Sequence, residues 1–158
     1  MASAYDFSFT TLKGEDYLLA QHSGKPLVVI NTASKCAFTP QYEALQALSR
    51  KFTDITFIAV PCNDFGSGEP GTASEIDSFC VLTYNVTFPI MTKVTTKGPA
   101  AHPFFTWVAD EKGGLAKPRW NFYKYLINRQ GRLMDYFVPS TTPGSKKFAH
   151  ALEALFYS

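Results

Sequence analysis

The sequence has little of several features that would mark particular classes of protein. It has only three cysteines in 158 residues, an odd number that a secreted disulfide framework would rarely use. Its three histidines, His22, His102 and His150, are scattered and offer no metal-ligand spacing. There is no Gly-rich phosphate loop and no run near the ~18 apolar residues of a spanning helix. We therefore expect no metal, no cofactor and no integral membrane association.

The charge is nearly balanced, with fifteen Lys and Arg against thirteen Asp and Glu. A net charge of +2 gives no electrostatic footprint for nucleic acid, so the expected partners are small molecules or proteins. The first residues lack the basic and apolar segments of a secretory signal. We expect a cytoplasmic protein in which each cysteine is either reactive or simply buried.

Residues 1–158 show no internal repeat or linker, which predicts a single domain. Alternation at Phe7–Phe9 followed by Gly14 predicts an N-terminal β-hairpin. Two continuous apolar runs, residues 26–31 and 55–60, are typical of strands buried on both faces. Between them, helical spacing predicts a helix with Thr39 as N-cap and Pro40 at N1.

The second half predicts further helices and a strand pair. After a Gly- and Pro-rich loop, Thr72 or Ser74 opens a helix whose Ile76, Phe79 and Cys80 share one face. Further elements are expected as a helix at 102–109, strands at 122–127 and 133–138, and a last helix from Pro143 or Gly144. This order predicts an α/β protein of the thioredoxin-like fold, with a central mixed β-sheet flanked by helices and an N-terminal β-hairpin.

Cys36 lies between the first buried strand and the helix after it. Sites in open α/β sheets lie beyond the carboxyl ends of strands, and a helix N-terminus favours thiolate over thiol. Lys35 adds a nearby cation. A thiolate there would be a nucleophile, whereas the alternative is that Cys36 is a small buried side chain. The position of Cys36 in the sequence favours neither interpretation over the other. Because Thr39 stands where a Cys-x-x-Cys motif has its second cysteine, a sulfenic acid at Cys36 would need a distant thiol.

Three blocks, in order and spread over nearly the whole chain, make the sequence recognisable. They are residues 31–42 (NTASKCAFTPQY), residues 61–66 (PCNDFG), and residues 120–122 (WNF) followed by an apolar strand and residues 128–132 (NRQGR). Together they closely resemble the signatures of the glutathione peroxidases, in the non-selenium form that takes electrons from thioredoxin.

The resemblance implies a catalytic group of Cys36, Trp120 and Asn121, with a fourth member from the Asn63–Asp64 loop. The Trp120 indole N–H and the Asn121 amide are donors that would stabilise the thiolate and orient the peroxide. Trp107 lies outside the motifs and is expected in the core. The family usually has glutamine at Asp64, and an ionised carboxylate there would oppose a thiolate. We expect Asp64 to be protonated, or to point away while Asn63 donates, or else to weaken the activity.

In the thioredoxin-dependent branch, a resolving cysteine occupies the place of Cys80. A bridge requires Cα atoms within about 7 Å, so we predict that the helix carrying Cys80 unwinds or shifts during turnover. The alternative for Cys80 is a plain core position, and Cys62 is expected to be a bystander. Only twelve residues separate Trp107 from Trp120, whereas the tetrameric glutathione-using members have a long insertion there. We therefore expect a monomer with an open site, suited to thioredoxin more than to glutathione.

The favoured function is reduction of hydrogen peroxide and organic hydroperoxides by Cys36, with Cys80 resolving the sulfenic acid and thioredoxin, or glutathione, as reductant. The main alternative is a peroxide sensor that passes its disulfide to a client protein. A catalytically silent binding domain has only the Asp64 substitution in its support. A peroxiredoxin would have threonine three residues before its cysteine, where this chain has Ala33.

Overall fold

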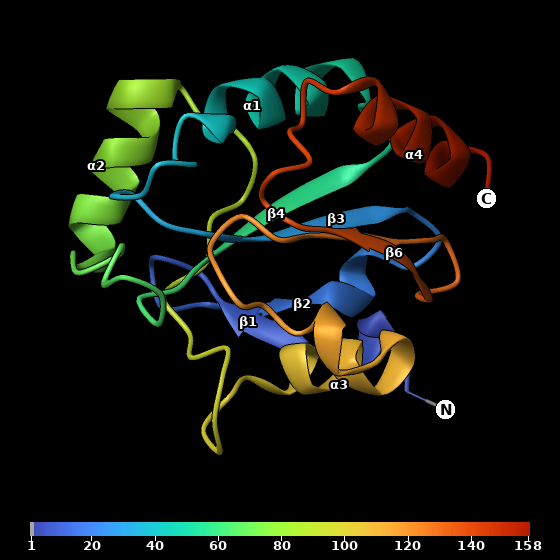
Figure 1. Ribbon diagram of the computed structural model, residues 1–158, viewed down its shortest axis with the longest axis horizontal. Coiled ribbons are helices and arrows are strands. Elements are labelled where there is room, and N and C mark those ends of the chain that lie inside the picture. Colours follow the sequence, from blue (N-terminus) through green and yellow to red (C-terminus); the bar gives the residue numbers. More distant parts are fainter. Residues whose placement is uncertain (1) are drawn as a thin grey trace.

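A computed structural model describes residues 2–158 and is built around a mixed four-stranded sheet (Figure 1). The strands lie in the order β4 (Thr56–Pro61), β3 (Leu27–Thr32), β5 (Lys124–Ile127) and β6 (Leu133–Phe137). β3 and β4 are parallel, while β5 is antiparallel to both of its neighbours. A separate antiparallel pair, β1 (Ser8–Thr10) and β2 (Asp16–Leu18), confirms the predicted hairpin.

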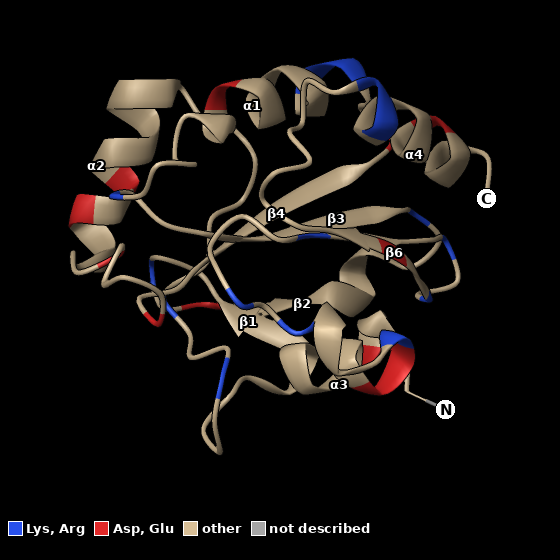
Figure 2. Cartoon of the chain, viewed as in Figure 1, with Lys and Arg blue, Asp and Glu red and all other residues tan. Residues whose placement is uncertain are grey.

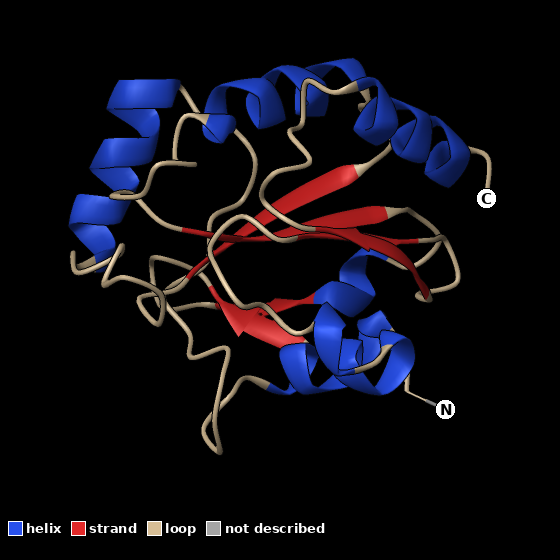
Figure 3. Cartoon of the chain, in the orientation of Figure 1, coloured by secondary structure: helices blue, strands red, loops and turns tan. Residues whose placement is uncertain are grey.

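The helices cover both faces of this sheet (Figures 1 and 3). α1 (Gln41–Lys51) and α4 (Lys146–Phe156) lie on one face, and α3 (Pro103–Lys112) lies on the other with the hairpin. α2 (Ala73–Tyr84) stands at the side of the sheet next to α1. Three short 3-10 helices complete the elements: Ala4–Asp6, Leu19–His22 and Gly114–Ala116.

The central strands are buried on both faces because their side chains alternate between two apolar clusters. Val28 and Ile30 face a cluster that includes residues of α1, α2 and α4. Val29 faces a second cluster with residues of α3 and the N-terminal segment, among them Trp107. Trp107 is 5% exposed, which confirms its expected core position. The continuous apolar runs in the sequence are explained by this two-sided burial.

Two predicted helix starts differ from the structure. α1 begins at Gln41 with Pro40, not Thr39, at the cap position. The Thr39 hydroxyl is occupied in the preceding turn, where it contacts backbone groups of Ala33 and Cys36. α4 begins at Lys146, because Ser145 accepts the Phe148 N–H and caps the helix. The predicted start of α2 is confirmed, since Thr72 and Glu75 form a capping box.

Acidic and basic residues are distributed over several helices and loops and do not gather on one element (Figure 2). α1 carries Glu43 in its first turn and Arg50 and Lys51 in its last, the arrangement that complements a helix dipole. Within residues 2–158, no helix has both the length and the apolar character needed to cross a membrane.

Candidate active site

Cys36 lies in the turn between β3 and α1 and is half-buried. The Phe38 N–H points at its sulfur, with 3.4 Å between nitrogen and Sγ. Thr39 holds the turn, because its hydroxyl oxygen accepts the Cys36 N–H at 3.0 Å and donates to the Ala33 carbonyl at 2.9 Å. This turn therefore presents a partly accessible sulfur with a backbone donor already in place.

Gly68 is the point at which all three sequence blocks meet. Its N–H donates to the carbonyl of Phe65, in the second block, at 3.3 Å, and its carbonyl oxygen accepts the Lys35 N–H at 2.9 Å. A Cβ added at Gly68 would lie 3.1 Å from both the Ala33 Cβ and the Lys35 carbonyl oxygen, and 3.3 Å from Asn121 Nδ2. The Cys36 turn, the loop after β4 and the segment before β5 are therefore in close contact, which the sequence alone did not locate.

Trp120 covers the loop after β4 and remains 40% exposed. Its ring stacks so closely on Gly66 that a Cβ there would lie 2.9 Å from Cη2. Gly66 also has φ of 62°, a left-handed conformation that glycine adopts without strain. The Phe65 ring lies 6.2 Å from the Trp120 ring, centroid to centroid. An exposed indole thus lies at the surface next to the segments that meet at Gly68.

Asn121 is fully buried beside Gly68. Its Nδ2 donates to the Phe65 carbonyl at 3.3 Å, and its Oδ1 has no hydrogen-bond partner within the described structure. Nδ2 carries two protons, so one remains for another acceptor. A buried amide with free hydrogen-bonding capacity is unusual, and it suits a group that binds a transient species.

Asn31, at the end of β3, anchors the Trp120–Asn121 segment. Its Nδ2 donates to the Trp120 carbonyl at 2.9 Å, and its Oδ1 accepts the Tyr123 N–H at 2.9 Å. Its backbone carbonyl accepts the Phe122 N–H. Phe122 has φ of 66°, a rare conformation for a bulky residue that surrounding contacts must enforce. Asn31 belongs to the first sequence block, but nothing in the sequence indicates that it anchors the Trp120–Asn121 segment.

Asp64 turns its carboxylate toward Thr96. Oδ2 accepts the Thr96 N–H at 2.6 Å and lies 3.1 Å from the Thr96 hydroxyl, which donates to it. Asn63 Oδ1 accepts the Glu69 N–H at 2.8 Å. Both side chains therefore stabilise the loop itself.

The other two cysteines are fully buried, and all three thiols are free. Burial raises the pKa of the Cys80 thiol to about 11, and burial raises the pKa of Cys62 to about 11 as well. Cys80 lies in the same apolar cluster as Tyr42 and Ile76, and Cys62 contacts the Thr96 hydroxyl. Neither thiol is ionised at neutral pH while it stays in this position.

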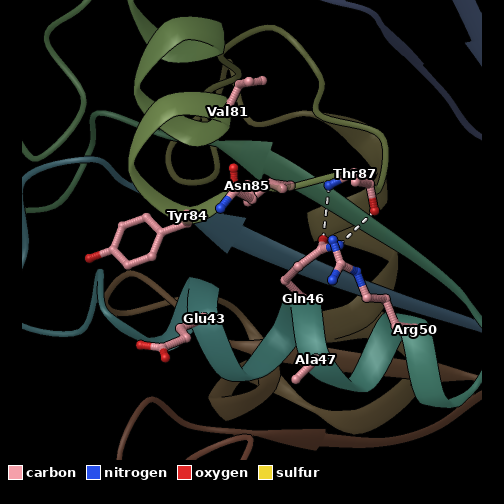
Figure 4. Close-up of a pocket in the computed structure, with 9 residues that line it drawn as sticks. Glu43, Gln46, Ala47, Arg50, Val81, Tyr84, Asn85 and Thr87 are labelled. Atoms are coloured by element: carbon pink, nitrogen blue, oxygen red, sulfur yellow. Dashed lines mark hydrogen bonds between the residues drawn. The ribbon is translucent and has the colours of Figure 1, made fainter.

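Of the pockets that border α2, two also border α1 or the Cys36 turn. The first, between α1 and α2, contains Gln46, whose amide binds both the backbone N–H and the hydroxyl of Thr87 (Figure 4). The second has a volume of about 430 Å³ and lies between the Cys36 turn and the first turns of α2. Its lining includes Ser34, Lys35, Glu69, Ile76 and Phe79. Within residues 2–158, no group of three His, Cys, Asp or Glu side chains is placed to hold a metal ion.

Comparison with known proteins places the chain among relatives of the same architecture. Residues 4–109 match the family model for glutathione peroxidase. The hydroperoxy fatty acid reductase gpx1 of Synechocystis is 44% identical over 149 residues, covering 88% of each chain. Glutathione peroxidase-like peroxiredoxin 2 of Saccharomyces cerevisiae is 40% identical, covering 90% of this chain and 91% of its own.

Solved structures agree with these sequence matches. The crystal structure of T. cruzi GPX1 superimposes with a TM-score of 0.80 at 29% identity, covering 99% of this chain and 98% of that one. A thioredoxin family protein from Chlorobium tepidum has a TM-score of 0.71 at 15% identity, over 95% of this chain and 92% of its own, which shows the shared thioredoxin-like fold. The chain therefore belongs to the glutathione peroxidase family and is a hydroperoxide-reducing oxidoreductase of the thioredoxin-like fold.

Proposed function

We propose that Cys36 is the residue that reduces the hydroperoxide. Its thiolate attacks the terminal peroxide oxygen, the O–O bond breaks, and the products are a Cys36 sulfenic acid and water or an alcohol. The observation that supports this assignment is the close contact at Gly68 between the segment just before Cys36 and Asn121, together with a half-buried sulfur that receives the Phe38 N–H. Such an arrangement would bring the nucleophile and donors from distant parts of the chain into one site.

Trp120 and Asn121 are proposed to bind the reacting atoms. Asn121 supports this role because its buried amide has a spare proton and an unpartnered oxygen. Donors fixed by the fold stabilise charge that develops on sulfur and oxygen without reorganising during the reaction. Asp64 is proposed to hold the loop through Thr96, in keeping with the alternative that it points away from the sulfur.

Cys80 is proposed to resolve the sulfenic acid. Cys80 is fully buried on α2, and the proposal includes a movement of this helix that brings the two sulfurs together. The resulting disulfide would be reduced by exchange with thioredoxin. A protein reductant is also favoured by the short segment from α3 to β5, which holds only one short 3-10 helix.

The substrates are proposed to be hydrogen peroxide and organic hydroperoxides. The exposed indole of Trp120 leaves the site open to bulky molecules. The Synechocystis relative is called a hydroperoxy fatty acid reductase, which supports lipid hydroperoxides as part of this range. A single domain over residues 1–158, a monomeric state and a cytoplasmic location remain predictions.

The test is a peroxidase assay with thioredoxin and with glutathione, on wild type and on Cys36→Ser, Cys80→Ser and Cys62→Ser. We expect Cys36→Ser to abolish turnover and Cys80→Ser to abolish only the thioredoxin-driven reaction. Cys62→Ser is the matched control and should retain full turnover. Full thioredoxin-driven activity in Cys80→Ser would contradict the resolving role, and stable mixed disulfides with a client would indicate a sensor.

A further inference from the structure

A group of polar side chains lies inside the apolar interior between β3, α1, α2 and the loop before α2. Four of their oxygen atoms are fully buried and have no hydrogen-bond partner within residues 2–158: Thr32 Oγ1, Ser34 Oγ, Tyr42 Oη and Glu69 Oε2. Their nearest polar groups belong to the same group: the Tyr42 hydroxyl lies near Thr32, and the Glu69 carboxyl lies near Ser34. These contacts lack the geometry of good hydrogen bonds, which is uncommon for buried polar atoms. The free thiol of Cys80 lies beside the Tyr42 hydroxyl within this group.

Glu69 is the charged member of the group and is only 1% exposed. Its backbone is fixed at both ends, since its N–H donates to Asn63 Oδ1 at 2.8 Å and its carbonyl accepts Lys93 Nζ at 3.1 Å. Burial is the main cause that raises the pKa of the Glu69 carboxyl, and the nearby Ser34 hydroxyl and Lys93 charge oppose it. A carboxyl group in such surroundings holds a proton more readily than one in water.

Glu69 lines the pocket between the Cys36 turn and the first turns of α2. It lines the pocket of about 430 Å³ together with Ser34 and Lys35, the residues just before Cys36. The same pocket is lined by Ile76 and Phe79, which lie one turn and one residue before Cys80 on α2. Burial is the main cause that raises the pKa of Cys80 and of Tyr42, and the Glu69 charge adds to the rise in each. The pocket is therefore bounded both by the turn that carries Cys36 and by the part of α2 next to Cys80.

We propose that Glu69 accepts the Cys80 proton when Cys80 resolves the Cys36 sulfenic acid. The Cys80 sulfur then forms a bond to the Cys36 sulfur as the Cys36 S–O bond breaks. The departing hydroxide takes the proton back from Glu69 and leaves as water. The Cys80 sulfur is oxidised and the Cys36 sulfur is reduced, so no other reagent is required. This inference rests on the proposed resolving role of Cys80.

Proton acceptance explains how a thiol that is not ionised at neutral pH becomes a nucleophile. A buried carboxylate next to a buried thiol is repelled by the thiolate, and transfer of one proton between them removes that repulsion. A general base of raised pKa is suited to work near neutral pH. The ionisable groups that face Glu69 and Cys80 are Lys35, Lys93, Glu75, Tyr42 and Asp77.

The experiment follows one turnover of the reduced protein with one equivalent of hydrogen peroxide and no thioredoxin. It measures peroxide loss, sulfenic acid trapped by dimedone, and disulfide formation by mass spectrometry. We expect Glu69→Gln to leave peroxide loss within about twofold of wild type and to slow disulfide formation about 100-fold, so that sulfenic acid accumulates. Glu69→Asp should restore part of the rate. Glu75→Gln, an exposed carboxyl of the same pocket, should resolve like wild type.

Disulfide formation at the wild-type rate in Glu69→Gln would overturn the proposal. Cys80→Ser distinguishes failure of the Glu69 proposal from failure of the Cys80 proposal. If Cys80→Ser blocks disulfide formation and Glu69→Gln does not, only the proposed role of Glu69 is contradicted. If Cys80→Ser forms the same internal bridge through another thiol, the resolving assignment itself fails. Should Glu69→Gln not fold, the wild-type pH profile decides. Disulfide formation should level off once Glu69 is ionised, and a rate that rises tenfold per pH unit through pH 9 would contradict its role.

Discussion

The backbone N–H of Val86 donates to the carbonyl oxygen of Cys80 across 3.2 Å, so the C-terminal cap of α2 is built on the residue proposed to move. Asn85 adopts a left-handed conformation, with φ of 53°, to complete this cap. Its own N–H bonds the Cys80 and Val81 carbonyls. If Cys80 is displaced as proposed, the bonds that end the helix would break and the last turn of α2 would open.

We predict that formation of the Cys36–Cys80 disulfide exposes the backbone of α2. The amides of residues 79–87 should lose protection from hydrogen exchange when the protein is oxidised with peroxide. The amides of α4 should keep theirs, because that helix has no part in the change. The measurement is hydrogen exchange by mass spectrometry on reduced and oxidised protein. Unchanged protection in α2 would contradict a mechanism that requires the helix to open.

Substitutions of the two tryptophans should distinguish an effect on catalysis from an effect on core packing. Trp120→Phe removes the exposed indole N–H, and we expect the second-order rate with hydrogen peroxide to fall by a factor on the order of 10². Trp107→Phe is the matched control and should leave that rate unchanged, while it lowers the free energy of unfolding by about 1–3 kcal/mol because Trp107 is buried. Stopped-flow kinetics and urea unfolding measure the two effects. Equal rates in wild type and Trp120→Phe would remove Trp120 from the site.

Replacement of Asn31 by aspartate tests the anchor of the Trp120–Asn121 segment. Aspartate keeps an acceptor for the Tyr123 N–H but places an oxygen against the Trp120 carbonyl, where Nδ2 now donates. We expect the free energy of unfolding to fall by about 1–3 kcal/mol and the peroxide rate to fall with it. Urea unfolding and stopped-flow kinetics measure both. Loss of stability with an unchanged peroxide rate would show that the anchor has no part in positioning the donors.

The three thiols should differ sharply in alkylation. Burial raises the pKa of Cys62 and Cys80 to about 11 in the reduced fold, so their thiolates are scarce at pH 8. Cys36 is half-buried and receives an N–H donor. We predict that iodoacetamide at pH 8 labels Cys36 alone in native protein and all three in urea, as read by peptide mass spectrometry. Rapid native labelling of Cys80 would mean that α2 opens without oxidation.

Because of Lys124, the free energy of unfolding should depend on pH. Lys124 is fully buried in β5, and its Nζ donates to three backbone carbonyls, those of Val138, Pro139 and Thr141. Burial lowers its pKa from 10.5 to about 7. Between pH 7 and 10.5 the unfolded chain binds more protons than the folded one, so stability should rise with pH in this window. Lys124→Met should remove that rise in urea unfolding from pH 7.5 to 9.5. If the free energy of unfolding of Lys124→Met rises just as steeply with pH, other ionisable groups must cause the rise.

Much of the fold was predictable because local patterns specify it. The apolar runs of β3 and β4 and the capping box at Thr72 appear directly in the sequence, and the structure confirms them. The start of α1 was predicted wrongly because the Thr39 hydroxyl serves the Cys36 turn, a choice made by nearby backbone that spacing does not reveal. The anchoring role of Asn31 and the burial of Glu69 were not predicted because both depend on contacts between distant segments.

The sheet divides the apolar interior into two clusters, and this division limits how far a local opening of α2 would destabilise the rest of the fold. Cys80 and α2 contribute to one cluster, whereas α3 and Trp107 belong to the other. Sub-global opening on the first side leaves the hydrophobic contacts of the second side in place. The second cluster would thus stay packed while α2 opens and closes, so repeated opening of α2 need not unfold the whole domain.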